Sequence, residues 1–325
     1  LKVTTRLKQL HKLFSAMGEV CVTAEMCHPQ KPEVTVFYEP DTHTVCSVVR
    51  DPNSYKVAVV DSVMGFDFPS GSTSTAHADQ VIDFIQQNGL QVEWILETHA
   101  HADHLSAAPY IQEKLGGKIA IGENIRLVQD VFAGVFNLGP NFQRDGSQFD
   151  KLFADGETFR LGELTASVIY TPGHTPACVC YLIGDALFTG DTLFMPDYGT
   201  ARCDFPGGSS KLLYESIQRI MMLPDETRVF VGHDYLPKDG RKEFAWETTV
   251  GDEKRHNIHV GGGKSQDEFC QMRDHRDAQL AIPKLIVPSV QVNIRAGRFP
   301  EPDANGHVAL SLPINKLSNT GSLNP

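Results

Sequence analysis

The first part of the chain alternates short apolar runs with turn-forming residues. Runs rich in β-branched and aromatic side chains span residues 34–38, 44–49 and 56–60, and each is bounded by Pro, Asp or Asn. Runs of this length and composition are typical of β-strands. A stretch at 76–88 that is stopped by Gly89 predicts a helix after these strands.

Beyond residue 90 the pattern changes to strands that alternate with helices. Strands are predicted at 92–97, 118–121, 161–170, 177–183, 186–189 and 228–231, and helices at 105–115, 123–132 and 211–222. Strands that alternate with helices indicate an α/β protein with layers packed around a large sheet system.

The pattern divides the chain into three parts. Residues 1–33 are predicted to be an N-terminal appendage, and residues 34–240 hold the predicted strands and the helices between them. From about residue 240 the sequence becomes more polar, with a glycine loop at 261–263 and a helix at 265–279. We therefore expect residues 241–325 to be a C-terminal extension packed on the same domain.

The composition excludes several classes of partner. The chain has 325 residues, of which 41% are hydrophobic and 21% charged, as in an ordinary globular protein. Its formal charge of −11 disfavours binding to nucleic acid. No apolar run approaches the roughly 20 residues that a membrane-spanning helix needs. We therefore expect a small-molecule substrate, no nucleic acid and no membrane span.

The cysteines and the N-terminus bear on the compartment. Seven cysteines are scattered without a CxxC pair, which favours a reducing compartment over a disulfide framework. Four basic residues precede the first acid, Glu19, so the start is either a solvated helix or the remnant of an organelle-targeting segment. The prediction is a cytoplasmic protein, or a mitochondrial one if the remnant is real. A homodimer is one assembly that the sequence leaves open.

A cluster of metal-ligand side chains follows the strand predicted at 92–97. His99, His101, Asp103 and His104 lie within six residues. Imidazoles and a carboxylate gathered this closely favour a bound cation. The run therefore predicts a metal centre.

Three further candidates complete this set. His174, Asp191 and His233 each follow a glycine, just after a predicted strand. Loops at strand ends carry the ligand sites of layered α/β proteins. Asp61 is predicted to be a structural hydrogen-bonding residue, with a role beside the metal ligands as the alternative. The remaining histidines are interpreted as surface or hydrogen-bonded core residues: His11, His28, His43, His77, His256, His259, His275 and His307.

These motifs together resemble the metallo-β-lactamase superfamily. They are HxHxDH at 99–104, TPGHT at 171–175, FTGD at 188–191 and GHDY at 232–235. The resemblance covers residues 34–240, and it implies an αββα sandwich with a metal site at one edge of the two sheets.

Two branches of the superfamily are more similar still. The stretches GDTL at 190–193, GTARCDF at 199–205 and NIRAG at 293–297 resemble persulfide dioxygenases. The stretches AAPY at 107–110, FMPDYGTAR at 194–202 and HNIHV at 256–260 resemble bacterial β-lactamase-hydrolase-like proteins. The loop between Asp191 and Arg202 is slightly longer than in the dioxygenases, which indicates a different pocket rim.

The seven candidate ligands fit two metals in one arrangement. Asp191 would bridge two Zn(II) ions, the first held by His99, His101 and His174 and the second by Asp103, His104 and His233. This is the arrangement of glyoxalase II, which the chain also resembles. Two metals lower the pKa of a bridging water and polarise a thioester carbonyl.

In the other arrangement the resemblance to persulfide dioxygenases implies one Fe(II) per chain. Its ligands would be His99, His174 and Asp191, a facial triad that leaves positions open for substrate and O2. The four remaining residues would orient ligands or waters. The ligand list satisfies both arrangements.

Arg202 is predicted to bind substrate. Its guanidinium could hold a carboxylate of glutathione through paired hydrogen bonds. The alternative is a surface salt bridge, and Arg295 is a second candidate for the same task.

The predicted function is a non-haem iron sulfur dioxygenase that oxidises glutathione persulfide with O2 to sulfite and glutathione. The first alternative is a dinuclear zinc hydrolase of glutathione thioesters or related acyl compounds. The second is a binding or sensor protein on a retired enzyme scaffold. Proteins that have lost their enzymatic activity usually lack some of the metal ligands. This chain keeps all seven, so an enzyme is expected.

Overall fold

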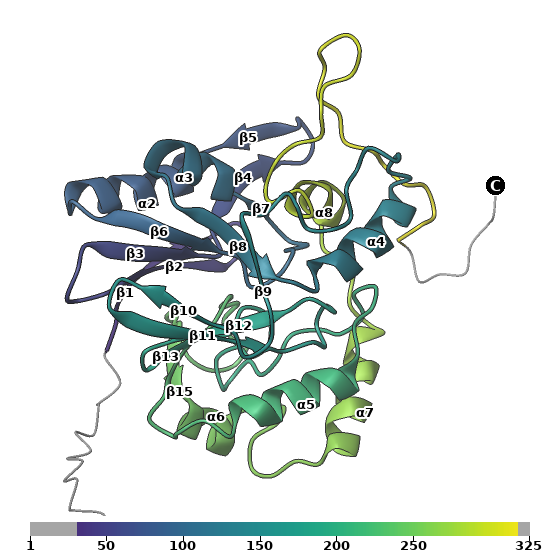
Figure 1. Ribbon diagram of the computed structural model, residues 1–325. Helices are drawn as coiled ribbons and strands as arrows, with labels where there is room; N and C mark the ends of the chain where they lie inside the picture. The colour runs from purple at the N-terminus through teal and green to yellow at the C-terminus, as the bar shows by residue number, and fades with distance from the viewer. Residues whose placement is uncertain (1–30, 318–325) are drawn as a thin grey trace, which may run out of the picture. The chain divides into compact units, whose positions relative to one another are not determined.

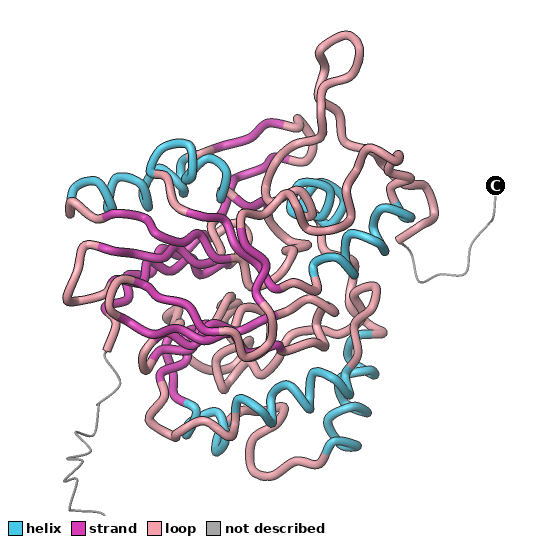
Figure 2. Tube along the Cα trace, in the orientation of Figure 1, coloured by secondary structure: helices cyan, strands magenta, loops and turns pink. Residues whose placement is uncertain are grey.

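Two six-stranded β-sheets lie face to face between two groups of helices (Figure 1, Figure 2). The computed structural model describes residues 31–317. The first sheet has the order β1 (Glu33–Glu39), β2 (Thr44–Arg50), β3 (Lys56–Val60), β6 (Gln91–Leu96), β8 (Lys118–Gly122) and β9 (Lys151–Phe153). Four neighbouring strands of this sheet run parallel, namely β3, β6, β8 and β9, so their carboxyl ends meet at one edge.

The second sheet is mostly antiparallel. Its order is β10 (Thr158–Leu161), β11 (Leu164–Tyr170), β12 (Val179–Ile183), β13 (Ala186–Phe188), β14 (Arg228–Phe230) and β15 (Glu247–Thr249). Only β13 and β14 pair in parallel among these neighbours. Their carboxyl ends therefore lie side by side, which brings the segments after them together.

Helices cover the outer face of each sheet. The first sheet packs against α2 (Ala76–Gln87), α3 (Ala108–Leu115) and α4 (Ile125–Val135), joined by α8 (Ile286–Asn293) (Figure 1). The second packs against α5 (Ser210–Ile220), α6 (Val250–His256) and α7 (Gln266–Asp277). A third small sheet has the order β5 (Ser72–Ser74), β4 (Val63–Asp67) and β7 (Leu105–Ser106).

Three apolar clusters hold these layers together. One lies between the sheets and contains Leu96, Val168, Tyr181 and Phe230, and the other two lie under the helices. Each fully buried aliphatic or aromatic side chain contributes about 1.5–3 kcal/mol. The αββα sandwich predicted from the sequence is confirmed.

Most predicted strands and helices are present with ends shifted by a few residues. The strand predicted at 161–170 corresponds to β11 but begins too early, because a turn at Gly162, with φ +56°, separates β11 from β10, to which Leu161 belongs. The helix predicted at 105–115 begins only at Ala108, since Leu105 and Ser106 pair with β4 instead. Missing from the prediction are β4, β5, β7, β9, β10, β15, α6 and α8.

The helix α8 was missed because Pro288 lies within it. Proline is tolerated in the first turn of a helix, where its missing N–H would have no helical partner. Val290 and Ile294 pack into the core under the first sheet. The C-terminal region therefore shares a core with the strands of the first sheet.

The predicted division of the chain into three parts stays a prediction. Residues 1–30, which carry the basic N-terminus, lie outside the described residues. The five cysteines within the described residues are all free thiols. Across residues 31–317 no helix combines the length and apolar character needed to cross a bilayer.

Candidate metal centre

Four loops at one edge of the sandwich carry the seven predicted ligands. The HxHxDH segment follows β6, His174 lies between β11 and β12, and the last two ligands follow β13 and β14. Ring centroids lie 4.1 Å apart for His99 and His101, 5.1 Å for His99 and His174, and 4.2 Å for His101 and His104. The structure thus brings together residues that are up to 134 positions apart in sequence, from His99 to His233 (233 − 99).

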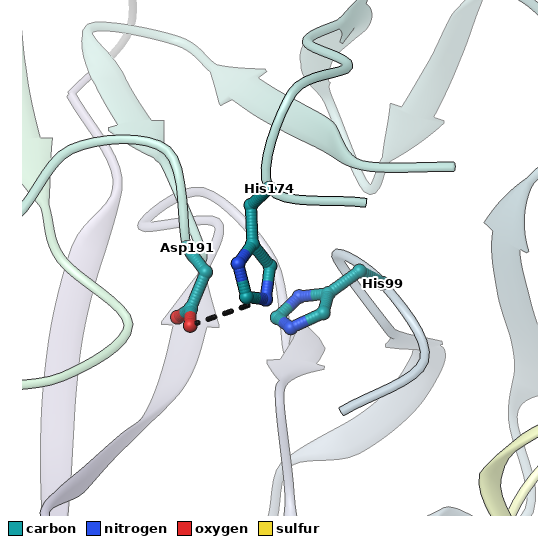
Figure 3. Close-up of side chains that lie close together, drawn as sticks. All are labelled: His99, His174 and Asp191. Atoms are coloured by element: carbon teal, nitrogen blue, oxygen red, sulfur yellow. Dashed lines mark ion pairs between the residues drawn. The ribbon is translucent and has the colours of Figure 1, made fainter. Parts of the chain in front are cut away.

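One group of ligands is formed by His99, His174 and Asp191, whose ligand atoms all lie within 4.8 Å of one another. Figure 3 shows the three side chains converging from separate loops. The Oδ2 atom of Asp191 lies 3.6 Å from Nε2 of His174. All three side chains are buried or nearly so.

A second group lies beside the first. The ligand atoms of His101, Asp103 and His104 are within 4.8 Å of one another. His233 Nε2 lies 3.3 Å from Oδ2 of Asp103 and 3.3 Å from Oδ1 of Asp191. The two oxygens of Asp191 therefore face different groups.

Hydrogen bonds on the far side of each ring set the tautomers. The Thr98 hydroxyl donates to Asp61 Oδ2 at 2.8 Å, so its oxygen accepts from Nδ1 of His99 at 3.0 Å. His174 Nδ1 donates to the carbonyl oxygen of Arg202 at 2.8 Å. Nδ1 of His104 is 3.2 Å from the carbonyl oxygen of Leu105. Each ring is left with a lone pair on Nε2, the atom that faces the cluster.

The ring of His101 has the opposite orientation, because two buried carboxylates contact its Nε2 atom instead of Nδ1. Its Nε2 atom lies 3.1 Å from both Asp61 Oδ1 and Glu97 Oε2. Glu97 Oε1 also accepts from the Ser106 hydroxyl at 2.7 Å. Burial alone would lower the pKa of His101, but the charges of these carboxylates and their hydrogen bonds raise it well above its usual value. The Nδ1 atom of His101 is therefore the one that faces the cluster.

Several polar atoms of the cluster are buried without a hydrogen-bond partner among residues 31–317. They are His99 Nε2, His101 Nδ1, His104 Nε2, Asp103 Oδ2, Asp191 Oδ1 and His233 Nδ1. A buried polar atom without a partner is costly, and native proteins leave few of them. A cation bound at either ligand group would satisfy the atoms of that group, so the donor set fits a metal ion.

The pKa shifts of three of these residues, His99, His104 and Asp103, also fit a metal. Burial lowers the pKa of His99 well below its usual value and that of His104 to about 3, helped by neighbouring imidazoles. The pKa of Asp103 is raised by burial, but the imidazoles of His233 and His104 outweigh this and lower it. Neutral imidazole and ionised carboxylate are the forms that bind metals.

Two glycines allow the loops to pass this closely. A Cβ atom at Gly190, where φ is +46°, would collide with the Thr98 side chain. A Cβ atom at Gly173 would collide with the backbone of Leu213 at the start of α5. The glycine before each ligand is thus required by close backbone approach.

The cluster opens on a cavity of about 620 Å³. His174, Asp191 and Asp103 line it, with apolar side chains from β4 and from the segment before α8. This volume suits a small organic ligand.

Arg202 also lines the cavity, but its guanidinium has other partners. Nε and Nη2 donate to the two carboxylate oxygens of Asp204 at 2.5 and 2.6 Å, and Nη1 donates to the carbonyl oxygen of Ala281 at 2.8 Å. The alternative read from the sequence, a salt bridge, is therefore present. The substrate-binding role of Arg202 stays a prediction, as does metal binding by the seven ligands.

Sequence reasoning missed two residues that support the cluster. Glu97 lies two residues before the first histidine of the HxHxDH run, yet a lone acid at a strand end gave no signal. Asn293 lies in the NIRAG stretch, which was noted only as a resemblance. Asp61 contacts both Thr98 and His101, as the alternative interpretation of that residue proposed.

Comparisons with known proteins identify a family and several relatives that this chain resembles. The family described as "Metallo-beta-lactamase superfamily" matches residues 40–233. A β-lactamase hydrolase-like protein of Agrobacterium fabrum is 49% identical over 286 residues, covering 88% of this chain and 65% of that protein. Glyoxylase B2 of Dictyostelium discoideum is 46% identical over 289 residues, covering 88% of this chain and 98% of that protein.

A more distant likeness joins the chain to persulfide dioxygenases. The mitochondrial persulfide dioxygenase ETHE1 of Mus musculus is 28% identical over 264 residues, covering 80% of this chain and 87% of that protein. The crystal structure of ETHE1 from Myxococcus xanthus matches with a TM-score of 0.65 and 28% identity, covering 82% of this chain and all of that one (100%).

Proposed function

The chain belongs to the metallo-β-lactamase superfamily, and we propose that within it this protein is a non-haem iron dioxygenase that oxidises glutathione persulfide with O2 to sulfite and glutathione. The observation that carries the proposal is the group formed by His99, His174 and Asp191. Two imidazoles and one carboxylate are the ligand set of non-haem Fe(II) oxygenases. The likeness to the mouse and Myxococcus proteins supports the same function.

The surroundings of this group suit a sulfur substrate. Fe(II) bound there would supply adjacent open positions for a sulfur ligand and O2. The hydrogen bonds from His174 to the Arg202 carbonyl oxygen and from His99 to Thr98 hold both rings in place. Met64 and Phe66 line the same cavity and contribute apolar surface to it.

The reaction balances without a further reductant. One persulfide, one O2 and one water give one glutathione, one sulfite and two protons. The terminal sulfur loses four electrons, and these reduce O2 completely. The protein therefore needs no flavin or nicotinamide for this chemistry.

A dinuclear zinc hydrolase of glutathione thioesters is the second candidate. The observation that favours it is the placement of Asp191, with Oδ2 near His174 and Oδ1 near His233. A carboxylate with one oxygen toward each of two ligand groups suits a bridging role. The names of the Agrobacterium and Dictyostelium relatives agree with a hydrolase.

The two candidates differ in metal content and substrate. The protein is purified without O2, its metals are counted, and two assays follow: O2 uptake with glutathione persulfide, and hydrolysis of S-lactoylglutathione. We expect one iron per chain, O2 uptake and no thioester turnover. An iron-loaded protein that consumes no O2 with the persulfide would contradict the proposal.

Two alanine variants sharpen this test. His99→Ala should lose the iron and the O2 uptake, because His99 belongs to the three-residue group. His104→Ala should keep one iron per chain, because His104 belongs to the other group. If the site holds two zinc ions, His104→Ala instead lowers the metal content from two to one.

A further inference from the structure

Four cationic side chains line the cavity beside the metal cluster, and carboxylates neutralise only two of them. Arg202 pairs with Asp204, and the buried Arg273 pairs with Asp277. Within the described part of the chain no carboxylate lies at ion-pair distance from Arg276 or Lys284, the other two cations. Arg276 and Lys284 are both exposed and have no counter-charge at ion-pair distance among residues 31–317, although four carboxylates elsewhere line the same cavity, those of Glu39, Asp41, Asp103 and Asp191.

The hydrogen-bond donors of Arg276 are also left without an acceptor. Within residues 31–317, the polar contact of the Arg276 guanidinium is with Nε2 of His259, 3.4 Å from Nη1. His259 Nδ1 already accepts from the backbone N–H of Thr200 at 3.0 Å. Burial and the charges of Arg273 and Arg276 lower the pKa of His259 to about 3, so the ring is neutral. Its single proton is then on Nε2, which cannot accept from Arg276.

A tyrosine also contributes to the lining of this cavity. Tyr198 lines the cavity from the loop between Asp191 and Arg202, which the resemblance to persulfide dioxygenases implied to be slightly longer than theirs. Burial raises the pKa of Tyr198, and the positive charge of Arg276 acts against that rise. No hydrogen bond joins the Tyr198 hydroxyl to any residue in the range 31–317. It is therefore a third free donor.

We propose that Arg276, Lys284 and Tyr198 form a carboxylate-binding subsite of the cavity, which holds a carboxylate of a peptide-like thiol while its sulfur lies at His174 and Asp191. The guanidinium supplies a two-pronged donor for a carboxylate, the ammonium a point charge, and the phenol one further donor. The cavity is large enough for such a molecule. Naming glutathione as that thiol rests on the proposed function.

The test uses a non-reactive probe. Binding of S-methylglutathione to the metal-loaded protein is measured by calorimetry for the wild type, Arg276→Gln and Lys284→Gln. The matched controls are Arg144→Gln and Lys211→Gln, two exposed cations that do not line the cavity. We expect Arg276→Gln to weaken binding by about 10-fold to 100-fold, Lys284→Gln by less, and the controls to bind as the wild type.

Esterification of the glycine carboxylate of the probe tests whether this group is the one that binds Arg276. The glycine ethyl ester of S-methylglutathione should bind the wild type more weakly and should be insensitive to Arg276→Gln, because both changes remove the same contact. Equal binding of the free acid by wild type and Arg276→Gln would overturn the subsite. Loss of probe binding in Arg202→Gln alone would also overturn the subsite. Failure of the probe to bind the wild type would do the same. The probe consumes no O2, so this outcome is independent of the dioxygenase assay.

Discussion

The side-chain amide of Asn293 donates a hydrogen bond of 2.8 Å to the carbonyl oxygen of His104. The same Nδ2 atom donates to the carbonyl oxygen of His101 at 2.8 Å, and Oδ1 accepts from the backbone N–H of Ser106. Asn293 is the last residue of α8 and is buried. One residue of the C-terminal region therefore holds the backbone of the loop that carries four of the seven predicted ligands.

Asn293→Asp should destabilise this loop. A carboxylate cannot donate to two carbonyl oxygens, and each lost partner in a buried site costs about 1–3 kcal/mol, more where a charge is buried. We expect a lower melting temperature and faster loss of metal to a chelator. Asn305→Asp in an exposed turn is the matched control. Unchanged metal retention in Asn293→Asp would show that the loop is held by other contacts.

Asp61→Asn and Glu97→Gln should separate the two metal arrangements. The two carboxylate oxygens of Asp61 accept from the backbone N–H and the hydroxyl of Thr98, and the hydroxyl in turn accepts from His99. An asparagine amide has only one acceptor oxygen, so Asp61→Asn breaks one of these bonds and disturbs the orientation of His99. Loss of such an outer partner typically costs 10-fold to 100-fold in metal affinity. Glu97 contacts the ring of His101 alone among the ligand side chains, so Glu97→Gln should keep the iron.

The measurement for this pair is the iron retained against a series of chelators. Asparagine tolerates the φ of +53° found at Asp61, so Asp61→Asn keeps the backbone. A drop from two metals to one in Glu97→Gln would favour the dinuclear hydrolase instead.

Gly190→Ala should lower the metal content of the protein, while its loss of folding stability should be similar to that of a control variant. The new Cβ atom would displace Thr98, which accepts from His99. Gly71→Ala is the matched control, because φ is +69° there and nothing lies within 4 Å of the added atom. Both variants should lose about 1–2 kcal/mol from the strained backbone. Only Gly190→Ala should lose iron, as measured by metal analysis after dialysis.

Glu253 should make the protein less stable as the pH rises. Burial raises the pKa of this carboxyl in α6 to about 8 from an ordinary 4.5, and its Oε1 atom has no partner among residues 31–317. Between these values the folded state holds a proton that the unfolded state releases. The free energy of unfolding therefore falls through this window, by at most about 1.4 kcal/mol per pH unit, and levels off above the higher pKa.

The matching experiment compares urea unfolding from pH 5 to 9 in wild type and Glu253→Gln. The variant should flatten that part of the profile, while Glu226→Gln, at an exposed position, should follow the wild type. Identical profiles for wild type and Glu253→Gln would rule out this carboxyl as the source.

The ligand cluster was predictable because its chemistry is local. His99, His101, Asp103 and His104 are close in sequence, and the other three each follow a glycine and a short apolar strand. Strands of this kind run to a common edge, so residues after them meet there. The turn at Gly162 escaped prediction because apolar residues continue on both sides of it.

The partners of polar side chains were not predictable, because they depend on which surfaces meet. Arg202 has the charge needed to bind a substrate carboxylate, but its guanidinium already pairs with Asp204. Arg276, from a helix that gave no functional signal, is the guanidinium left free at the cavity.

The residue pattern alone thus predicted an α/β layered protein and a cluster of seven candidate metal ligands, since side-chain chemistry and strand periodicity are properties of short segments. Packing of the sheets and of α7 and α8 decided the rest. It determined which imidazole nitrogen faces the cluster, that Asn293 holds the ligand loop, and which cations face the cavity without a counter-charge. Each of these depends on distances between segments that are far apart in the chain.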